Sequence, residues 1–224
     1  MFSGIGLKGL VGQRKRANQR KRISMHAYYI IIARIMESLL ISTGVVTLAE
    51  MGDKTQLLAF LLAARFKRPL PIILGILVAT LLNHGLAGAV GSWITQAVQP
   101  QVLQWILGAS FVAMAIWTLI PDKIEEEEAQ IANRLGVFGA TLITFFLAEM
   151  GDKTQIATVA MAAHYPDAVL VVIGTTLGML IADVPAVFIG DKLAGRIPMR
   201  LVRSIAAGVF LLLGVSVLVA AATA

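Results

Sequence analysis

The nonapeptide LAEMGDKTQ occupies Leu48–Gln56 and occurs again, unchanged, at Leu147–Gln155, 99 positions further along the chain. Each copy places a Glu, an Asp and a Lys in the middle of a stretch that is otherwise apolar. Charges at the centre of a membrane helix cost about 2.5–3.5 kcal/mol each on insertion scales, so they are rarely kept without a function. Two identical copies at equivalent points of a repeat therefore predict one paired site, and we expect that site to bind a cation.

The composition around these motifs is that of a membrane protein. Of the 224 residues, 58% are hydrophobic and 14% are charged, and the mean hydropathy is +0.81. A soluble domain of this length would need more polar residues to cover its surface. Because a helix needs about 20 apolar residues to cross a bilayer, we predict an all-α integral membrane protein with six transmembrane helices. The six spans lie near residues 37–63, 70–91, 102–120, 136–162, 168–189 and 201–222.

The 99-residue offset divides the chain into two related halves. Residues 36–120 form the first three-helix repeat and residues 136–224 the second, and an acidic cytoplasmic linker, 121–135, joins them. Since three is an odd number, the second half must enter the membrane from the opposite side. Inverted repeats of this kind build secondary transporters, with the substrate site at mid-membrane between the halves.

Basic residues in the loops predict the orientation. The loops after the first, third and fifth spans carry Lys and Arg, whereas the loops after the second and fourth spans carry neither. By the positive-inside rule, the basic loops are cytoplasmic and both ends of the membrane core lie outside the cytoplasm. We therefore expect a multi-pass protein of a bacterial inner (plasma) membrane. The residues that decide this are Arg65, Lys67, Arg68, Lys123, Arg134, Lys192, Arg196, Arg200 and Arg203.

Residues 1–35 form a basic tail that holds eight of the 19 Lys and Arg residues. A basic arm can bind nucleic acid or anionic lipid. We interpret this one as a disordered tail or as a stretch that precedes the native start at Met36, and we expect no nucleic-acid partner. In the linker, Glu125–Glu128 form a continuous acidic run. A solvated helix or turn is the simpler interpretation of this run, and a local collector of cations is the alternative.

The absence of cysteine restricts the chemistry of the site. Any metal must be held by oxygen or imidazole ligands, which favours hard cations. Read as continuous helix, Glu50 and Asp53 are three positions apart and share a face, as do Glu149 and Asp152. If the two motif helices meet, these four carboxylates converge at mid-membrane as metal ligands.

Neighbouring residues of the motif are candidates for supporting the ligands. Gly52 and Gly151 let a backbone approach closely or a turn unwind, which exposes carbonyl oxygens. A shell of about six to eight oxygens would suit calcium or manganese. The side chains that add neutral oxygens are Thr55, Gln56, Thr154 and Gln155.

Charge balance indicates what is exchanged. Lys54 and Lys153 would neutralise half of the four carboxylates if both lysines face the site, and one divalent ion or two protons would complete the neutralisation. This balance favours exchange of one divalent cation for about two protons. In the alternative interpretation, each lysine merely pairs within its own helix, Lys54 with Glu50 and Lys153 with Glu149 at i,i+4.

Three further polar residues lie within the predicted spans. Asn83 and His84 are inside the second span, and Asp183 occupies the position in the fifth span that matches His84. We expect Asp183 to support the ligands or to relay protons, with a helix–helix hydrogen bond as the alternative. His84 is either a functional residue or a satisfied packing residue.

The sequence E-x-G-D-K-T, found in the first span of each half, resembles the motif E-x-G-D-(K/R)-(T/S) of the Gdt-type family of cation/proton antiporters. This family includes a Golgi manganese transporter, chloroplast manganese transporters and bacterial manganese exporters. The resemblance covers about residues 36–222 and implies a six-helix inverted-repeat fold and exchange of Mn²⁺, or of Ca²⁺, against protons. It also implies that the ion-binding acids are Glu50, Asp53, Glu149 and Asp152. The tail departs from it, since compact bacterial members are not expected to carry one.

Two alternative functions fit the sequence less well. An exporter of amino acids or small solutes, of the lysine-exporter type, would not need four acids in duplicate. An intramembrane aspartyl protease needs aspartates in Tyr-Asp and Gly-x-Gly-Asp settings, and the chain has neither. No H-E-x-x-H, G-x-S-x-G or P-loop pattern occurs, so we expect no enzyme and no permanently bound cofactor. The expected partners are the transported ion, protons and the lipid bilayer, and the sequence leaves a homo-oligomer open.

Overall fold

The computed structural model describes residues 25, 28–29, 32–120, 135–189 and 199–223. The chain divides into two compact units, Met1–Glu37 and Ser38–Ala224, and the larger unit contains both motifs. The predictions for most of the basic tail, for the acidic linker and for four basic loop residues fall outside the described residues. These four are Lys123, Arg134, Lys192 and Arg196.

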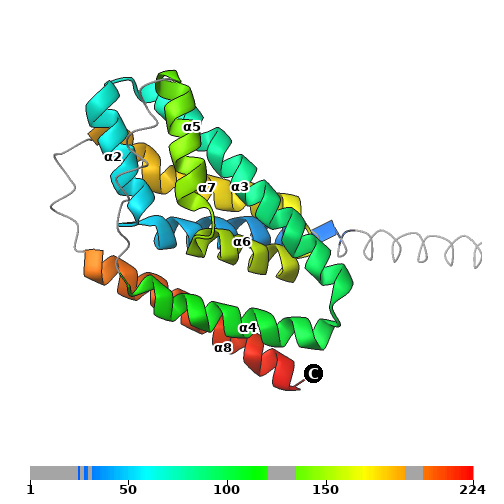
Figure 1. Cartoon of the computed structure of the whole chain (residues 1–224). Coiled ribbons are helices and arrows are strands. Elements are labelled where there is room, and N and C mark those ends of the chain that lie inside the picture. The colour runs from blue at the N-terminus through cyan, green and yellow to red at the C-terminus, as the bar shows by residue number, and fades with distance from the viewer. Residues whose placement is uncertain (1–24, 26–27, 30–31, 121–134, 190–198, 224) are drawn as a thin grey trace, which may run out of the picture. The chain divides into compact units, whose positions relative to one another are not determined.

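Regular structure in the described residues is entirely α-helical (Figure 1). A helix over Ile32–Glu50, unlabelled in the figure and called the first helix here, contributes its residues from 38 onward to the larger unit. The labelled helices are α2 (Lys54–Phe66), α3 (Pro69–Ala97), α4 (Pro100–Thr118), α5 (Gly136–Glu149), α6 (Lys153–His164), α7 (Ala168–Ile189) and α8 (Met199–Thr223).

Five helices of the described residues are long and apolar enough to cross a membrane. They are Ile32–Glu50, Pro69–Ala97, Pro100–Thr118, Ala168–Phe188 and Ser204–Thr223. The span predicted at 136–162 is instead divided into α5, 14 residues long, and α6, 12 residues long. The span predicted at 37–63 is divided in the same way, because the first helix ends at Glu50 and α2 begins at Lys54. The expectation of one continuous helix through each motif is therefore wrong.

Contacts between the two halves hold the larger unit together. Helix α3 packs against α5, α6 and α7, and α2 packs against α7 and α5. Helices α4 and α8 run side by side along one edge of the bundle (Figure 1), and α4 also contacts α6. The second helix of each half, α3 or α7, thus lies against the broken motif helices of the other half.

Two glycines show this exchange at matching positions. A Cβ added at Gly75 of α3 would lie 2.7 Å from the Cβ of Thr141 in α5. A Cβ added at Gly174 of α7 would lie 2.9 Å from the Cβ of Ser42 in the first helix. The two contacts are equivalent, because Gly174 is 99 positions after Gly75 and Thr141 is 99 positions after Ser42. The same close approach of two helices at a glycine therefore occurs twice. The missing side chain lets the helix backbones come close, as in many membrane helix pairs.

The seam between α4 and α8 includes one pair of residues at the same repeat position. Phe111 and Phe210 are 99 positions apart, and their rings stack with centroids 6.4 Å apart and planes inclined by 27°. Close to them along the seam, Gly108 and Gly214 face one another, since a Cβ on Gly214 would lie 3.0 Å from the carbonyl oxygen of Gly108. The third helices of the two halves therefore meet directly.

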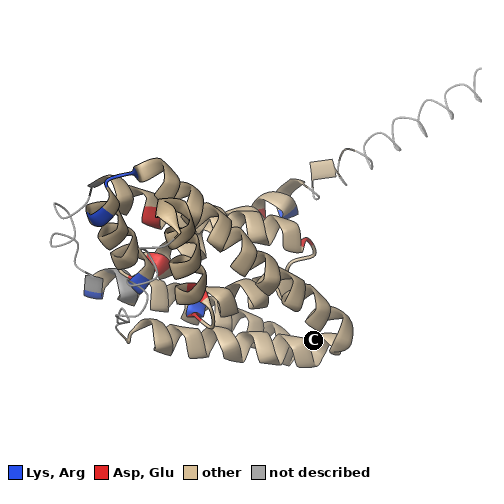
Figure 2. Ribbon diagram, turned by 45° about the horizontal axis from the view of Figure 1, so that its top comes forward, with Lys and Arg blue, Asp and Glu red and all other residues tan. Residues whose placement is uncertain are grey.

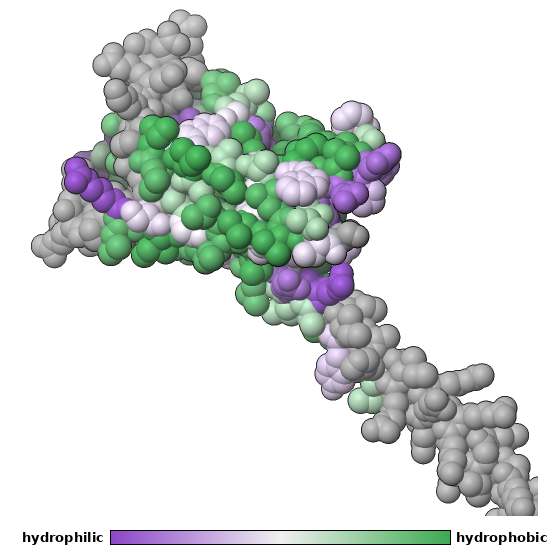
Figure 3. Space-filling view, turned by 90° about the horizontal axis from the view of Figure 1, so that it is seen from below, coloured by the Kyte–Doolittle hydropathy of each residue, from purple (hydrophilic) through white to green (hydrophobic). Residues whose placement is uncertain are grey.

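The surface of the bundle is apolar while part of its interior is polar. Figure 3 shows a broad green, apolar face over the helices. Large apolar side chains are exposed on the molecule, among them Leu212 at 72% and Val169 at 67%. Many Thr, Asp and Glu side chains are instead buried, including Glu50 and Glu149 at 0% exposure. A soluble protein shows the reverse arrangement, whereas a protein surrounded by lipid tails requires this one.

Candidate cation site

Both motifs interrupt a helix in the same way. The first helix ends at Glu50, and Asp53 precedes α2 with an extended backbone of φ −82° and ψ 171°. In the second motif α5 ends at Glu149, and Asp152 precedes α6 with φ −79° and ψ 164°. The two acids of a motif thus stand on either side of a helix break, so their expected i,i+3 relation on one continuous helix is wrong.

A glycine in the left-handed conformation makes each break possible. Gly52 has φ 82° and Gly151 has φ 75°, values that residues with a Cβ rarely adopt. The amide of each glycine donates to a glutamine four residues on, Gly52 to Gln56 Oε1 at 2.9 Å and Gly151 to Gln155 Oε1 at 2.8 Å. The unwinding that the glycines allow is present, and the glutamine side chains close the resulting turns.

A threonine orients the glutamate of each motif. Thr55 Oγ1 donates to Glu50 Oε2 at 2.6 Å, and Thr154 Oγ1 donates to Glu149 Oε2 at 3.0 Å. The second oxygen, Oε1, of each glutamate is buried and has no hydrogen-bond partner among the described residues. An oriented carboxylate with one buried oxygen left over is suited to bind a cation or a proton.

Three motif acids from both halves come together. Glu50, Asp53 and Asp152 each offer one carboxylate oxygen, and these oxygens all lie within 4.8 Å of one another. All three residues are at most 3% exposed. Figure 2 shows acidic positions, in red, inside the bundle of tan helices. Carboxylate oxygens at this spacing can close on a divalent cation, which takes such ligands at about 2.0–2.6 Å.

The fourth predicted ligand lies beside this group. Glu149 is 0% exposed and interacts electrostatically with Asp53 and Asp152, but no oxygen of Glu149 meets the spacing of the three acids. Electrostatic interactions also link Glu50 to Glu149 and to Asp183. The sequence prediction of four acids at one place thus corresponds to three acids in close array and one adjacent acid.

The lysines of the two motifs differ. Lys153 is 2% exposed, and its Nζ forms an ion pair of 2.5 Å with Asp53 Oδ1 of the other motif. Lys54 is half-buried and forms no ion pair within the described part of the chain. Neither of the pairs expected within one motif, Glu50 with Lys54 or Glu149 with Lys153, occurs among those residues. Of the two lysines that the charge balance counted, Lys153 is the one that pairs with a motif acid among the described residues.

The three further polar positions have different surroundings. Asn83 Nδ2 donates to the carbonyl oxygen of Phe146 at 2.9 Å, which joins α3 to α5. Asp183 and His84 are both 0% exposed, and none of their side-chain oxygens or nitrogens has a hydrogen-bond partner among the described residues. Asp183 interacts electrostatically with Glu50 and Glu149, so it belongs to the surroundings of the acids. The helix–helix hydrogen bond considered for Asp183 does not occur within the part of the chain that the structure describes.

Three buried hydroxyl groups were not singled out from the sequence. Ser42, Thr80 and Thr176 are at most 4% exposed and have no hydrogen-bond partner for the side-chain oxygen in the described ranges. Thr80 lies one helical turn before His84, so the two share a face of α3. This i,i+4 spacing was the available signal, but hydroxyl residues are too common in membrane helices to mark a site by themselves.

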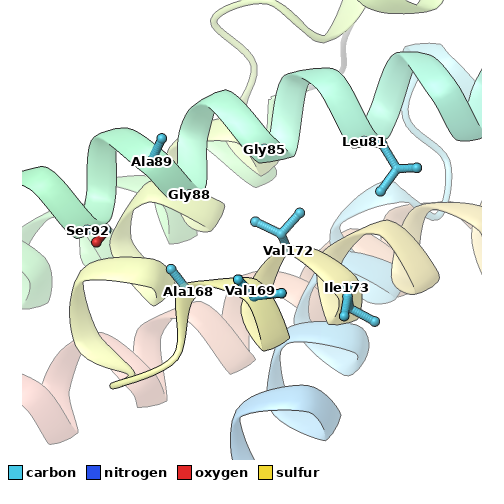
Figure 4. Close-up of a pocket in the computed structure, with 9 residues that line it drawn as sticks. All are labelled: Leu81, Gly85, Gly88, Ala89, Ser92, Ala168, Val169, Val172 and Ile173. Carbon is cyan, nitrogen blue, oxygen red and sulfur yellow. The ribbon is translucent and has the colours of Figure 1, made fainter.

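A cavity of about 450 Å³ between α3 and α7 has a different character (Figure 4). Its lining is apolar except for the hydroxyl of Ser92, and none of the motif acids contributes to it. The lining residues are Leu81, Gly85, Gly88, Ala89, Ser92, Ala168, Val169, Val172 and Ile173. A cation needs oxygen ligands, so this cavity is not a candidate for the ion.

An apolar helical bundle whose broken helices bring buried carboxylates together is the architecture of a membrane ion transporter. The sequence model of one family, described as divalent cation/proton antiporter GDT1, matches residues 38–126 and 137–224. The chain belongs to this GDT1 family, and it is a multi-pass membrane protein. The resemblance inferred from the E-x-G-D-K-T motifs is thereby confirmed.

Individual relatives agree with the family. A Vibrio cholerae protein named "Putative manganese exporter" is 51% identical over 183 residues, which cover 81% of this chain and 90% of that protein. A GDT1-like protein of Synechocystis is 30% identical over 191 residues, covering 76% of this chain and 91% of the relative. GDT1-like protein 3 of Arabidopsis thaliana is 30% identical over 209 residues, with 82% and 70% covered. No solved structure matches the chain.

The family also bears on the alternative functions. It is a family of antiporters, so neither the lysine-exporter type nor the aspartyl protease finds support in the comparisons. Its description as a transporter family agrees with the expectation that the protein is not an enzyme.

Proposed function

We propose that the protein exports a divalent cation in exchange for protons, through one mid-membrane site built from both motifs. The ligands are Glu50, Asp53, Glu149 and Asp152. The observation that carries this proposal is the buried array of three of these acids, which offers oxygens within 4.8 Å from both halves of the chain. Because a buried group of like charges is costly, a bound cation or bound protons must neutralise it.

The fold that we propose around the site is a pair of inverted three-helix repeats, 36–120 and 136–224. Its support is the twofold match of the family model, the equivalent approaches of Gly75 and Gly174, and the stacking of Phe111 on Phe210. In this arrangement each broken motif helix, with its two parts, counts as one crossing, which makes six. The basic loops orient the protein in a bacterial inner membrane with both ends of the core outside the cytoplasm.

Manganese is the ion that we propose first, and calcium second. The ligands are carboxylates, with the hydroxyls of Thr55 and Thr154 close by, and both ions accept such oxygens. The chain has no cysteine, which leaves out the thiolate ligands that softer metals prefer. The name of the Vibrio cholerae relative favours manganese.

Protons are the proposed counter-ion. The antiporter description of the family supports this. So does the charge of the site, because among the described residues one buried lysine, Lys153, accompanies five buried acids when Asp183 is included. When the cation leaves, protons can take its place on the carboxylates. Asp183 is a candidate for carrying one of them, and Thr55, Thr154, Gln56, Gln155, Asn83 and His84 support the site.

Metal flux in membrane vesicles tests this function. Everted vesicles that contain the protein should take up Mn²⁺ when a pH gradient, acidic inside, is applied, and uptake should fall when the gradient is collapsed. Glu50→Gln should abolish uptake, because it removes one ligand charge from the array. Glu37→Gln is the matched control at an exposed glutamate and should transport normally. Equal flux in wild type and Glu50→Gln would refute the site, and flux that ignores the gradient would refute proton exchange.

A further inference from the structure

We propose that Lys153 is a resident cation of the site, whose ammonium group competes with the divalent ion for Asp53 and so promotes release of the ion. The inference rests on the proposed function, because it assigns a role within the same site. It concerns one of two lysines that the sequence alone does not distinguish, since both stand in the same E-M-G-D-K-T context.

The first argument is position. Lys153 Nζ is 2.5 Å from Asp53 Oδ1, and Asp53 is one of the three acids that offer oxygens within 4.8 Å of one another. The ammonium therefore contacts the carboxylate array through Asp53, which is also a proposed metal ligand. It also connects the halves, because lysine and aspartate are 100 positions apart.

The second argument is burial. The side chains of Lys153 and Asp53 are both 2% exposed. A buried ammonium is tolerated only when it is paired with an acid, so Lys153 depends on the carboxylate array. Lys54, at the same position of the first motif, is half-buried and has no ion pair in the described residues. In this conformation only one of the two lysines occupies the array.

The third argument is electrostatic. A divalent ion bound to Asp53 would lie within a few ångströms of the ammonium, and like charges at such distances repel each other even at an effective dielectric constant of about 20. The ion and Lys153 therefore oppose each other at Asp53. Bound metal weakens the ion pair, and the returning ammonium helps to expel the metal. A transport site must bind its ion weakly enough to let it leave, and Lys153 supplies that weakening.

The test is a comparison of matched variants of the full-length protein in detergent and in proteoliposomes. Mn²⁺ binding is measured by electron paramagnetic resonance, in which the free ion gives a sharp signal that binding removes. Lys153→Met should bind Mn²⁺ at least about tenfold more tightly than wild type, because a like charge is removed from the array, and its Mn²⁺ flux should be slower. Lys54→Met is the control and should stay within about twofold of the wild-type affinity.

Two further variants separate the effect of the lysine charge from an effect of misfolding. Lys153→Gln removes the charge but keeps a hydrogen-bond donor toward Asp53, so it should also bind more tightly. Lys153→Arg keeps the charge and should bind like wild type. A thermal melt of each variant, with and without Mn²⁺, gives a second reading: the charge-removing variants should show a larger metal-induced rise in Tm than wild type.

The outcomes separate the two proposals. If wild type binds Mn²⁺, Glu50→Gln does not, and Lys153→Met or Lys153→Gln binds no more tightly than wild type, the role of Lys153 is refuted while the function stands. If Lys54→Met tightens binding as much as Lys153→Met, the effect is one of overall charge and the role is again refuted. If wild type binds neither Mn²⁺ nor Ca²⁺, the proposed function fails and this inference fails with it.

Discussion

Thr55 donates a hydrogen bond of 2.6 Å to Glu50 across the break between the first helix and α2, and it thereby fixes one of the two carboxylate oxygens. The other oxygen of Glu50 is buried and has no hydrogen-bond partner among the described residues. The motif thus uses its threonine to hold the glutamate, and it leaves the remaining oxygen available to the proposed ion. Thr154 repeats the arrangement with Glu149 in the second motif.

We expect Thr55→Val to lower Mn²⁺ affinity by roughly ten- to a hundredfold, because a hydrogen bond to a charged group contributes about 1.5–3 kcal/mol. Thr55→Ser keeps the hydroxyl and should stay close to wild type. Thr95→Val is a control outside the motifs, where the hydroxyl bonds only to backbone carbonyls of Gly91 and Ala163. Titration of Mn²⁺ against each variant measures the effect, and wild-type affinity in Thr55→Val would contradict the orienting role.

Gly151→Ala should destabilise the protein through its backbone alone. Gly151 has φ 75°, and a Cβ there would meet no atom within 4 Å, so the expected cost is the roughly 1–2 kcal/mol of the left-handed conformation. This corresponds to a fall in Tm of several degrees. Gly44→Ala is the matched control, because Gly44 lies in a helix with the same open space and alanine should be neutral or stabilising there. Equal melting temperatures in the two variants would contradict the strained break.

Gly75→Val and Gly174→Val should destabilise the bundle to a similar degree. The side chain added at Gly75 would clash with α5, and the one added at Gly174 would clash with the first helix. The neighbours are Thr141 at 2.7 Å and the backbone oxygen of Leu39, also at 2.7 Å. Gly85→Ala, on the same helix as Gly75 but with open space around it, should be harmless. Thermal melts in detergent provide the comparison. A large effect at one glycine and none at the other would count against equivalent packing of the two halves.

Asp183→Asn should impair Mn²⁺ flux more than His84→Asn, although the two positions are equivalent in the repeat. Asp183 interacts electrostatically with Glu50 and Glu149, whereas the fully buried His84 has no corresponding interaction with an acid among the described residues. Flux measured at a fixed Mn²⁺ concentration over a series of pH gradients shows the difference. Should His84→Asn prove as damaging as Asp183→Asn, the placement of Asp183 as the participating residue would be wrong.

Much of the fold could be predicted from the sequence because lipid imposes simple rules. Apolar stretches of sufficient length predict helices, and four of the six predicted spans are present as single long apolar helices. The span predicted at 37–63 contributes a fifth long helix, which ends at Glu50. The interruption at Gly52 and Gly151 was only partly predictable. Glycine permits the left-handed conformation, but whether a helix continues through it depends on the tertiary contacts around it.

The candidate site was likewise only partly predictable from the sequence. Identical motifs in a repeat predict that their acids meet, and three of the acids lie within 4.8 Å. The partner of each lysine could not be predicted, because Lys54 and Lys153 have identical neighbours in sequence. Local spacing favours an i,i+4 pair, but the helix break removes that geometry and Lys153 contacts Asp53 of the other half instead. Such a choice depends on the three-dimensional packing of the halves.

The most direct test of the central claim is the position of the ion itself. Crystals of the protein grown with Mn²⁺ and measured at the manganese absorption edge would locate the ion by anomalous scattering. We predict one strong peak coordinated by carboxylates of both motifs, among Glu50, Asp53 and Asp152 and next to Glu149. A peak bound by the residues of one motif only, or a peak away from these acids, would contradict a single site shared by the two halves.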